Sequence, residues 1–256
     1  MKYNTLLSFR VHLAKELSPV TALTYYKALG YLLKDQYLLD CKKMNVNAVL
    51  QKLTTMKYKN QYAKYKNAFL KFCDFIGLKL PTETLMTLDI MKKSKKKKYR
   101  KLKPVQLQDI KNRIKAIRDK KLKLSYETML YSGLRVSELA QIQKEDCFIE
   151  AASITLRFIG KGGGKESVVL YETENKNFFE RLKTFIQNTP PTQKVFYSAS
   201  HLQAKAKEKG FQCHDLRRAF AKVTYAKTRD IQAVKRLLRH TKPKNTRLYL
   251  NSNVKI

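Results

Sequence analysis

Four short patterns in the second half of the chain combine the cations, imidazoles and phenol that can cleave a phosphodiester without a metal ion. In chain order they hold Arg135 within SGLRVSEL, Lys161 within a glycine-rich segment, His214 and Arg217 within HDLRRAFA, and His240 with Tyr249 nine residues later. Each pattern alone is common on protein surfaces. Their order and spacing together indicate one site, since coincidence would have to supply every group that such a cleavage needs.

Cleavage of a phosphodiester needs a nucleophile, neutralisation of charge in the transition state, and a proton for the leaving oxygen. Tyr249 can attack once its hydroxyl has lost a proton, and it would then carry the cut strand covalently. Arg135 and Arg217 can each grip non-bridging oxygens in fork geometry. These two guanidinium groups would do the work that two metal ions do in other enzymes.

The remaining groups can move protons. Lys161 can protonate the departing 5′ oxygen, because an alkoxide is a poor leaving group. His214 and His240 can hydrogen-bond the phosphate and assist the transfer. The segment GKGGGK also holds Lys165, which could replace Lys161 as the acid.

In this order the residues resemble the tyrosine recombinase, or phage-integrase, family, whose signature is Arg, Lys, His-x-x-Arg, His and Tyr. The resemblance is close from about Pro104 to Tyr249, and its Gly-Lys-Gly match favours Lys161 as the acid. It implies a 3′-phosphotyrosine intermediate, a free 5′ hydroxyl, and strand exchange between two duplexes through a Holliday junction. It also implies a homo-tetramer on a specific double-stranded DNA site, with no cofactor, no metal and no ATP. An accessory protein is left open.

The resemblance assigns further residues and shows departures. Glu138, three residues after Arg135, stands where the family has an acidic residue that supports the site. Arg239 stands where many relatives have glycine, and it is expected to add a cation near the phosphate and tighten DNA contact. The segment 250–256 after Tyr249 is short, whereas relatives often carry a helix there that packs into a neighbouring protomer. We therefore expect that exchange to be reduced or replaced by another segment.

The charge balance points to the same kind of partner. The chain has 54 Lys and Arg against 20 Asp and Glu, a net charge of +34. A chain this basic is expected to bind a polyanion such as DNA or RNA. No apolar run approaches the ~18 residues of a membrane span, and the N-terminus does not read as a signal peptide. The four cysteines fit no zinc module and indicate reduced thiols in a cytoplasmic protein.

The fold class expected is mainly α with a small β-sheet, in two domains. Residues 1–90 are predicted to form a helical core DNA-binding bundle. One helix starts at Ser18-Pro19, with Ser at the N-cap and Pro at the first position, and another ends at Gly77. Further helices are expected before Ser18 and around residues 46–56. No space remains before Met1 for the extra arm-binding domain of larger phage integrases, so a simple, Xer-like or small mobile-element type is expected.

A basic linker, 91–103, follows and is expected to lie along phosphates. Its proposed DNA-binding residues are Lys95, Lys96, Lys97, Lys98 and Arg100. A nuclear-localisation signal is the weaker alternative. The catalytic domain, 104–256, is predicted to hold helices over 105–118, 125–132, 177–187, 201–209, 215–227 and 230–239. Strands over 154–159 and 167–171 are expected to form a hairpin around GKGGGK.

Two rival functions remain at the level of sequence. A type IB topoisomerase has the same active-site logic, but the small size and the motifs around Arg135 and His214 favour a recombinase. A non-catalytic DNA-binding protein would explain the charge, yet every catalytic residue type is present. The sequence does not separate chromosome-dimer resolution, mobile-element integration and inversion, and it does not reveal the DNA target. The protein is expected to act in the cytoplasm, on the nucleoid of a bacterial or archaeal host.

Overall fold

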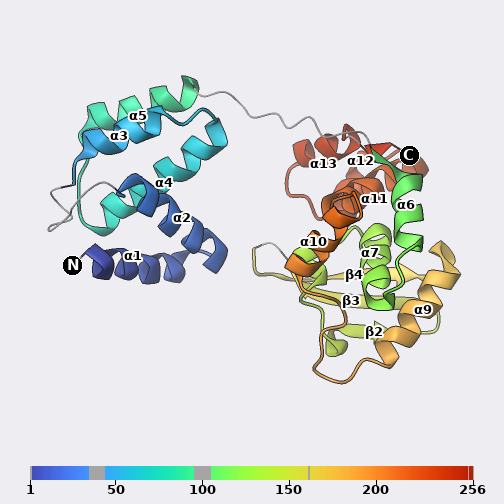
Figure 1. Ribbon diagram of the computed structural model, residues 1–256. Coiled ribbons are helices and arrows are strands. Elements are labelled where there is room, and N and C mark those ends of the chain that lie inside the picture. The colour runs from blue at the N-terminus through green and yellow to red at the C-terminus, as the bar shows by residue number, and fades with distance from the viewer. Residues whose placement is uncertain (1, 35–43, 95–104, 161, 253, 256) are drawn as a thin grey trace. The chain divides into compact units, whose positions relative to one another are not determined.

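The computed structural model describes residues 2–34, 44–94, 105–160, 162–252 and 254–255. By its internal contacts the chain divides into two compact units, Met1–Lys101 and Leu102–Ile256 (Figure 1). The fold is mainly helical, as expected, with a small antiparallel sheet in the second unit. The proposed DNA-binding residues of the linker, Lys95 to Lys98 and Arg100, lie outside the described residues.

The first unit contains α1 (Lys2–Glu16), α2 (Pro19–Leu32), α3 (Val46–Thr54), α4 (Lys59–Phe75) and α5 (Thr82–Ser94). The predicted start of α2 is confirmed, because the Ser18 hydroxyl accepts a hydrogen bond from the Thr21 amide at 3.4 Å. Gly77, with φ of 67°, follows the end of α4 as predicted. The sequence had indicated about four helices, and α5 had not been placed.

The helices of the first unit bury one apolar core. Phe9, Leu29, Phe69 and Phe72 are fully buried in it. The buried Tyr62 donates a hydrogen bond to the Leu88 carbonyl at 2.6 Å, which ties α4 to α5. None of the described helices of the chain is long and apolar enough to cross a bilayer.

The sheet of the second unit has the order β2–β3–β4, with β2 at Cys147–Ile149, β3 at Ser153–Ile159 and β4 at Lys165–Tyr171. All its pairings are antiparallel, and Ile159 pairs with Lys165 at the hairpin end. The tip is closed by a hydrogen bond from the Gly160 amide to the Gly164 carbonyl at 2.8 Å. Gly162 and Gly163 have φ of 114° and 88°, a conformation that requires glycine. The glycine-rich hairpin is therefore confirmed.

The helices of the second unit are α6 (Leu107–Lys115), α7 (Lys120–Ser132), α8 (Val136–Leu139), α9 (Lys176–Gln187), α10 (Ala199–Glu208), α11 (Cys213–Thr228), α12 (Ile231–Leu237) and α13 (Pro243–Leu250). α7 lies between the sheet and α11 (Figure 1). It begins earlier than predicted, because the Asp119 side chain caps it by accepting from the Leu122 amide at 2.9 Å. α6 starts later than the predicted 105–118, because Val105 and Gln106 form a strand, and it ends earlier, at Lys115.

That strand, β1 (Val105–Gln106), pairs in parallel with β5 (Val254–Lys255) from the end of the chain. Val254 is fully buried in the core of the second unit. Lys222 of α11 also donates to the Ser252 carbonyl at 3.1 Å. The segment that follows Tyr249 is therefore attached to its own chain.

Candidate active site

The first site element is the turn between α7 and α8. α7 ends at Gly133, whose φ of 65° lies in the left-handed region that favours glycine. A Cβ at this position would lie 2.5 Å from a ring carbon of Phe220, so the close packing also excludes a side chain. The turn buries Leu134 and places Arg135 at the N-cap of α8, where the Arg135 side chain is 26% exposed.

Glu138 fixes this turn. Its carboxylate accepts a hydrogen bond from the Arg135 amide at 2.8 Å and pairs with the Arg135 guanidinium. It also meets the guanidinium of Arg239 at 3.0 Å and lies 3.8 Å from that of Arg217. Burial alone would raise the pKa of Glu138, but the hydrogen bonds and charges of Arg135, with Arg239, hold that pKa below its ordinary value. Glu138 is thus a buried anion shared by three arginines.

Arg217 is the largest fully buried side chain of the structure. It lies on α11, and its guanidinium donates to the main-chain carbonyls of Gly133 and Leu238. Burial, followed by the charge of Arg135, lowers the pKa of Arg217 to about 10, so it stays charged at neutral pH. Its Nε, also buried, has no hydrogen-bond partner. Arg217 therefore joins the turn after α7 to the end of α12.

His214 lies one turn before Arg217 on α11. A capping box starts this helix, with the Gln212 amide donating to Asp215 at 2.9 Å. The His214 Nε2 lies 2.8 Å from the Tyr249 hydroxyl of α13, and the two rings meet edge to face at 5.1 Å between centroids. The side chains of Tyr249 and His214, which the sequence analysis singled out at distant positions, are therefore in hydrogen-bond contact.

His240 also packs against the tyrosine ring. Its ring is 4.8 Å from that of Tyr249, edge to face. Its Nδ1 lies 3.1 Å from the hydroxyl of Thr246, a fully buried residue of α13. This contact sets which ring nitrogen of His240 faces the site, and it couples the histidine to the helix that carries Tyr249.

Both imidazoles are neutral at neutral pH. Burial, and then the charges of Arg217 and Arg135, lowers the pKa of His240 to about 4. Protein atoms crowded around the ring, with Arg218 and Arg217, lower the pKa of His214 to about 4, although this residue still reaches solvent. A neutral His214 can accept the proton of Tyr249, whereas a protonated one could not.

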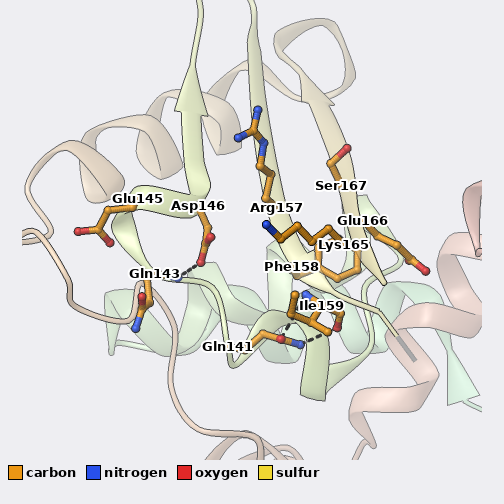
Figure 2. A pocket seen from close by; sticks show the side chains of 10 residues that line it. All are labelled: Gln141, Gln143, Glu145, Asp146, Arg157, Phe158, Ile159, Lys165, Glu166 and Ser167. Atoms are coloured by element: carbon orange, nitrogen blue, oxygen red, sulfur yellow. Dashed lines mark hydrogen bonds between the residues drawn. The ribbon is translucent and has the colours of Figure 1, made fainter. Parts of the chain in front are cut away.

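Of the two hairpin lysines, only Lys165 lies within the described residues. Lys161 lies outside the described residues, so the choice between it and Lys165 stays a prediction. Lys165 opens β4 beside an open hollow lined by residues of β3, β4 and the segment 141–146 (Figure 2). Gln141 anchors the end of β3, because its amide donates to the Ile159 carbonyl at 2.9 Å and accepts from the Ile159 amide at 3.2 Å.

Sequence reasoning missed three supporting residues: Gln141, Glu166 and Thr246. Gln141 and Thr246 carry no pattern of their own, and their partners become neighbours only through the tertiary fold. Arg239 had been expected near the phosphate. Its guanidinium contacts Glu138 and, at 2.9 Å, Glu166, and its place relative to a phosphate stays a prediction. Within the described part of the chain, no group of three His, Cys, Asp or Glu side chains is placed to hold a metal ion.

Comparisons with known proteins agree with this fold. Residues 100–255 match the model of the Phage integrase family. The chain therefore belongs to the phage integrase family of tyrosine recombinases, enzymes that break and rejoin DNA. No curated protein sequence matches it.

Solved structures of three recombinases share the fold at low identity. XerH recombinase bound to its difH substrate is 17% identical, covering 90% of this chain and 73% of that one, with a TM-score of 0.57. A lambda integrase tetramer bound to a Holliday junction is 14% identical, covering 96% and 76%, with a TM-score of 0.68. The Tn1549 transposon integrase with circular intermediate DNA is 14% identical, covering 96% and 94%, with a TM-score of 0.61.

Proposed function

We propose that this protein is a site-specific DNA recombinase that cuts and rejoins strands through a covalent bond between Tyr249 and a 3′ phosphate. The observation that carries the proposal is the 2.8 Å contact between the Tyr249 hydroxyl and His214 Nε2. The same site holds Arg135, Arg217 and His240. A half-buried tyrosine that served packing alone would not need a neutral base and two guanidinium groups around it.

The cleavage step balances with the residues of this chain. The Tyr249 oxygen attacks phosphorus as its proton passes to His214, and the bond from phosphorus to the 5′ oxygen breaks. The leaving oxygen takes a proton from the hairpin lysine, for which Lys161 is the candidate and Lys165 the alternative. Arg135 and Arg217 stabilise the charge on the non-bridging oxygens. The reverse step, with a 5′ hydroxyl of another duplex, completes an exchange without ATP.

The positions of the two arginines suit different tasks. Arg135 keeps partial exposure and can fold onto a phosphate that enters from solvent. Arg217 is fully buried and held by two carbonyls, so it acts as a fixed charge that needs no reorganisation during the reaction. Glu138 balances part of this charge, which keeps the site folded before DNA arrives.

We infer that the partner is double-stranded DNA carrying a specific recombination site, bound by four copies on two duplexes. The net charge of +34 supports a polyanionic partner. A lambda integrase tetramer on a Holliday junction and XerH on its difH substrate have the same fold. The first unit and the basic segment 91–103 would grip the duplex beside the cleavage site. Such work belongs to the nucleoid of a bacterial or archaeal cytoplasm.

The test is a suicide DNA, nicked near the cleavage point and built from repeats beside the protein's own gene. Wild type should form a covalent protein–DNA band on a denaturing gel, and Tyr249→Phe should form none. A band that persists in the variant would contradict the assignment of the nucleophile. The topoisomerase alternative predicts relaxation of any supercoiled DNA without exchanged products, so the products of two labelled duplexes decide between the two functions.

A further inference from the structure

Arg239 has a backbone conformation that its side chain does not favour. Its φ of 53° lies in the left-handed region, which is unfavourable for a residue with a Cβ and free of strain for glycine. Glycine would adopt this φ without strain. An arginine in this conformation indicates that contacts of its side chain offset the strain.

The side chain of Arg239 is directed to two carboxylates. Its Nη2 lies 3.0 Å from Glu138 Oε2, and its Nε lies 2.9 Å from Glu166 Oε2, an ion pair whose atoms are not aligned as a hydrogen bond. The guanidinium carbon stands 4.9 Å from the centre of the Phe158 ring. The side chain is 15% exposed. These contacts leave little of the cation for a DNA phosphate.

Each of the two carboxylates contacts a different segment that carries a proposed catalytic residue. Glu138 pairs with Arg135. Glu166 lies in β4 with its carboxylate directly against Gly160, at a place where any Cβ on Gly160 would collide with it. Gly160 is the residue before Lys161 in the sequence. Arg239 itself precedes His240, so one cation connects three segments of the site.

We propose that Arg239 is a positioning residue, which bridges Glu138 and Glu166 and so fixes Arg135 and the base of the lysine hairpin relative to His240. The inference rests on the proposed function and deepens it, because it adds to the cleavage site a cation that acts through other residues. A positioning role predicts that loss of Arg239 lowers the cleavage rate, whereas direct DNA contact predicts that it raises the Kd for DNA.

The decisive variant is Arg239→Gly, since glycine adopts the observed φ without strain. We expect the cleavage rate on saturating suicide DNA to fall about 10- to 100-fold, the usual cost of losing a residue that orients a catalytic group. The Kd for DNA and its salt slope should stay unchanged. Arg239→Lys should restore part of the rate, because an ammonium keeps the charge but cannot reach both carboxylates as a fork does.

Two variants test the bridge without altering Arg239. Glu166→Gln removes the charge of one partner, and Gly160→Ala forces the Glu166 carboxylate away. Both should slow cleavage, and Arg239→Gly combined with Glu166→Gln should be no slower than Arg239→Gly alone, since partners in one network are not additive. Thermal unfolding of each variant separates loss of rate from loss of fold.

Contrary outcomes are distinct. A higher Kd with a shallower salt slope and an unchanged saturated rate for Arg239→Gly would mean direct phosphate contact, and would overturn the inference. Independent, multiplying effects of the Arg239 and Glu166 changes would also overturn it. Absence of the covalent band in wild type would contradict the proposed function instead. The bridge would then be tested by unfolding experiments, in which non-additive effects of the Arg239 and Glu166 substitutions on the free energy of unfolding would support it and additive effects would overturn it.

Discussion

The substitution Glu138→Gln tests the electrostatic design of the site without changing its shape. The carboxylate of Glu138 is 3% exposed and is the anion that Arg135, Arg239 and Arg217 share. Glutamine keeps the volume but loses the charge, and its amide nitrogen would face a guanidinium that also only donates hydrogen bonds. The variant leaves three neighbouring cations without their common partner.

The magnitude follows from the burial of the pair. Removing one partner of a buried ion pair costs about 3–5 kcal/mol. Arg135 is 26% exposed and part of its charge is solvated, so the lower end, about 3 kcal/mol, applies here. For a domain of this size each kcal/mol lowers Tm by about 2–4 °C. A fall of roughly 6–12 °C is therefore expected.

The assay is thermal unfolding followed by circular dichroism at pH 7, since the chain has no tryptophan. Glu180→Gln, an exposed carboxylate on α9 of the same unit, is the matched control and should change stability by less than about 0.5 kcal/mol. Added sulfate should stabilise Glu138→Gln more than wild type, because the anion can occupy the uncompensated cation site. A Glu138→Gln protein as stable as wild type would refute the shared-anion reasoning.

Three further predictions follow from other parts of the structure. The pKa of His240 is lowered to about 4 in the folded protein, so the unfolded chain takes up the proton of this histidine first as the pH falls. The free energy of unfolding should therefore fall as pH drops from about 6.5 towards 4, with His240 contributing about 2 kcal/mol of the fall at pH 5. Urea unfolding of His240→Gln should show a smaller fall. Gly133→Ala should cost about 3 kcal/mol through its φ and the Phe220 clash, whereas the control Gly77→Ala, with similar φ and open space, should cost about 1 kcal/mol in the same measurement. DNA affinity should fall about 10³-fold between 50 and 200 mM salt in a binding titration, and a flat response would contradict the phosphate clamp.

The sequence predicted the local features of the fold well. The cap of α2 at Ser18, the end of α7 at Gly133 and the glycine-rich hairpin all depend on residues adjacent in the chain. Such signals are visible without tertiary information. The pairing of Val105 with Val254 was not predicted, because two-residue strands have no periodicity and their partners are far apart in the sequence.

The candidate site shows the same division. The residue types of Arg135, His214 and Tyr249 were identified from their spacing, and the structure brings His214 and Tyr249 into contact. The burial of Arg217 on main-chain carbonyls could not be predicted, since those carbonyls come from two other turns. The partners of Arg239 were missed for a related reason: its left-handed backbone conformation, which directs the side chain, has no sequence signal in a non-glycine residue.

The most direct test of the whole account is to identify the amino acid that carries the cut DNA. The covalent complex would be trapped on suicide DNA, digested with nuclease and trypsin, and examined by mass spectrometry. We expect the peptide of residues 248–255, released by cleavage after Arg247 and Lys255, to carry a nucleotide through its 3′ phosphate on Tyr249. A nucleotide on another residue, or one joined through its 5′ phosphate, would contradict the proposed chemistry.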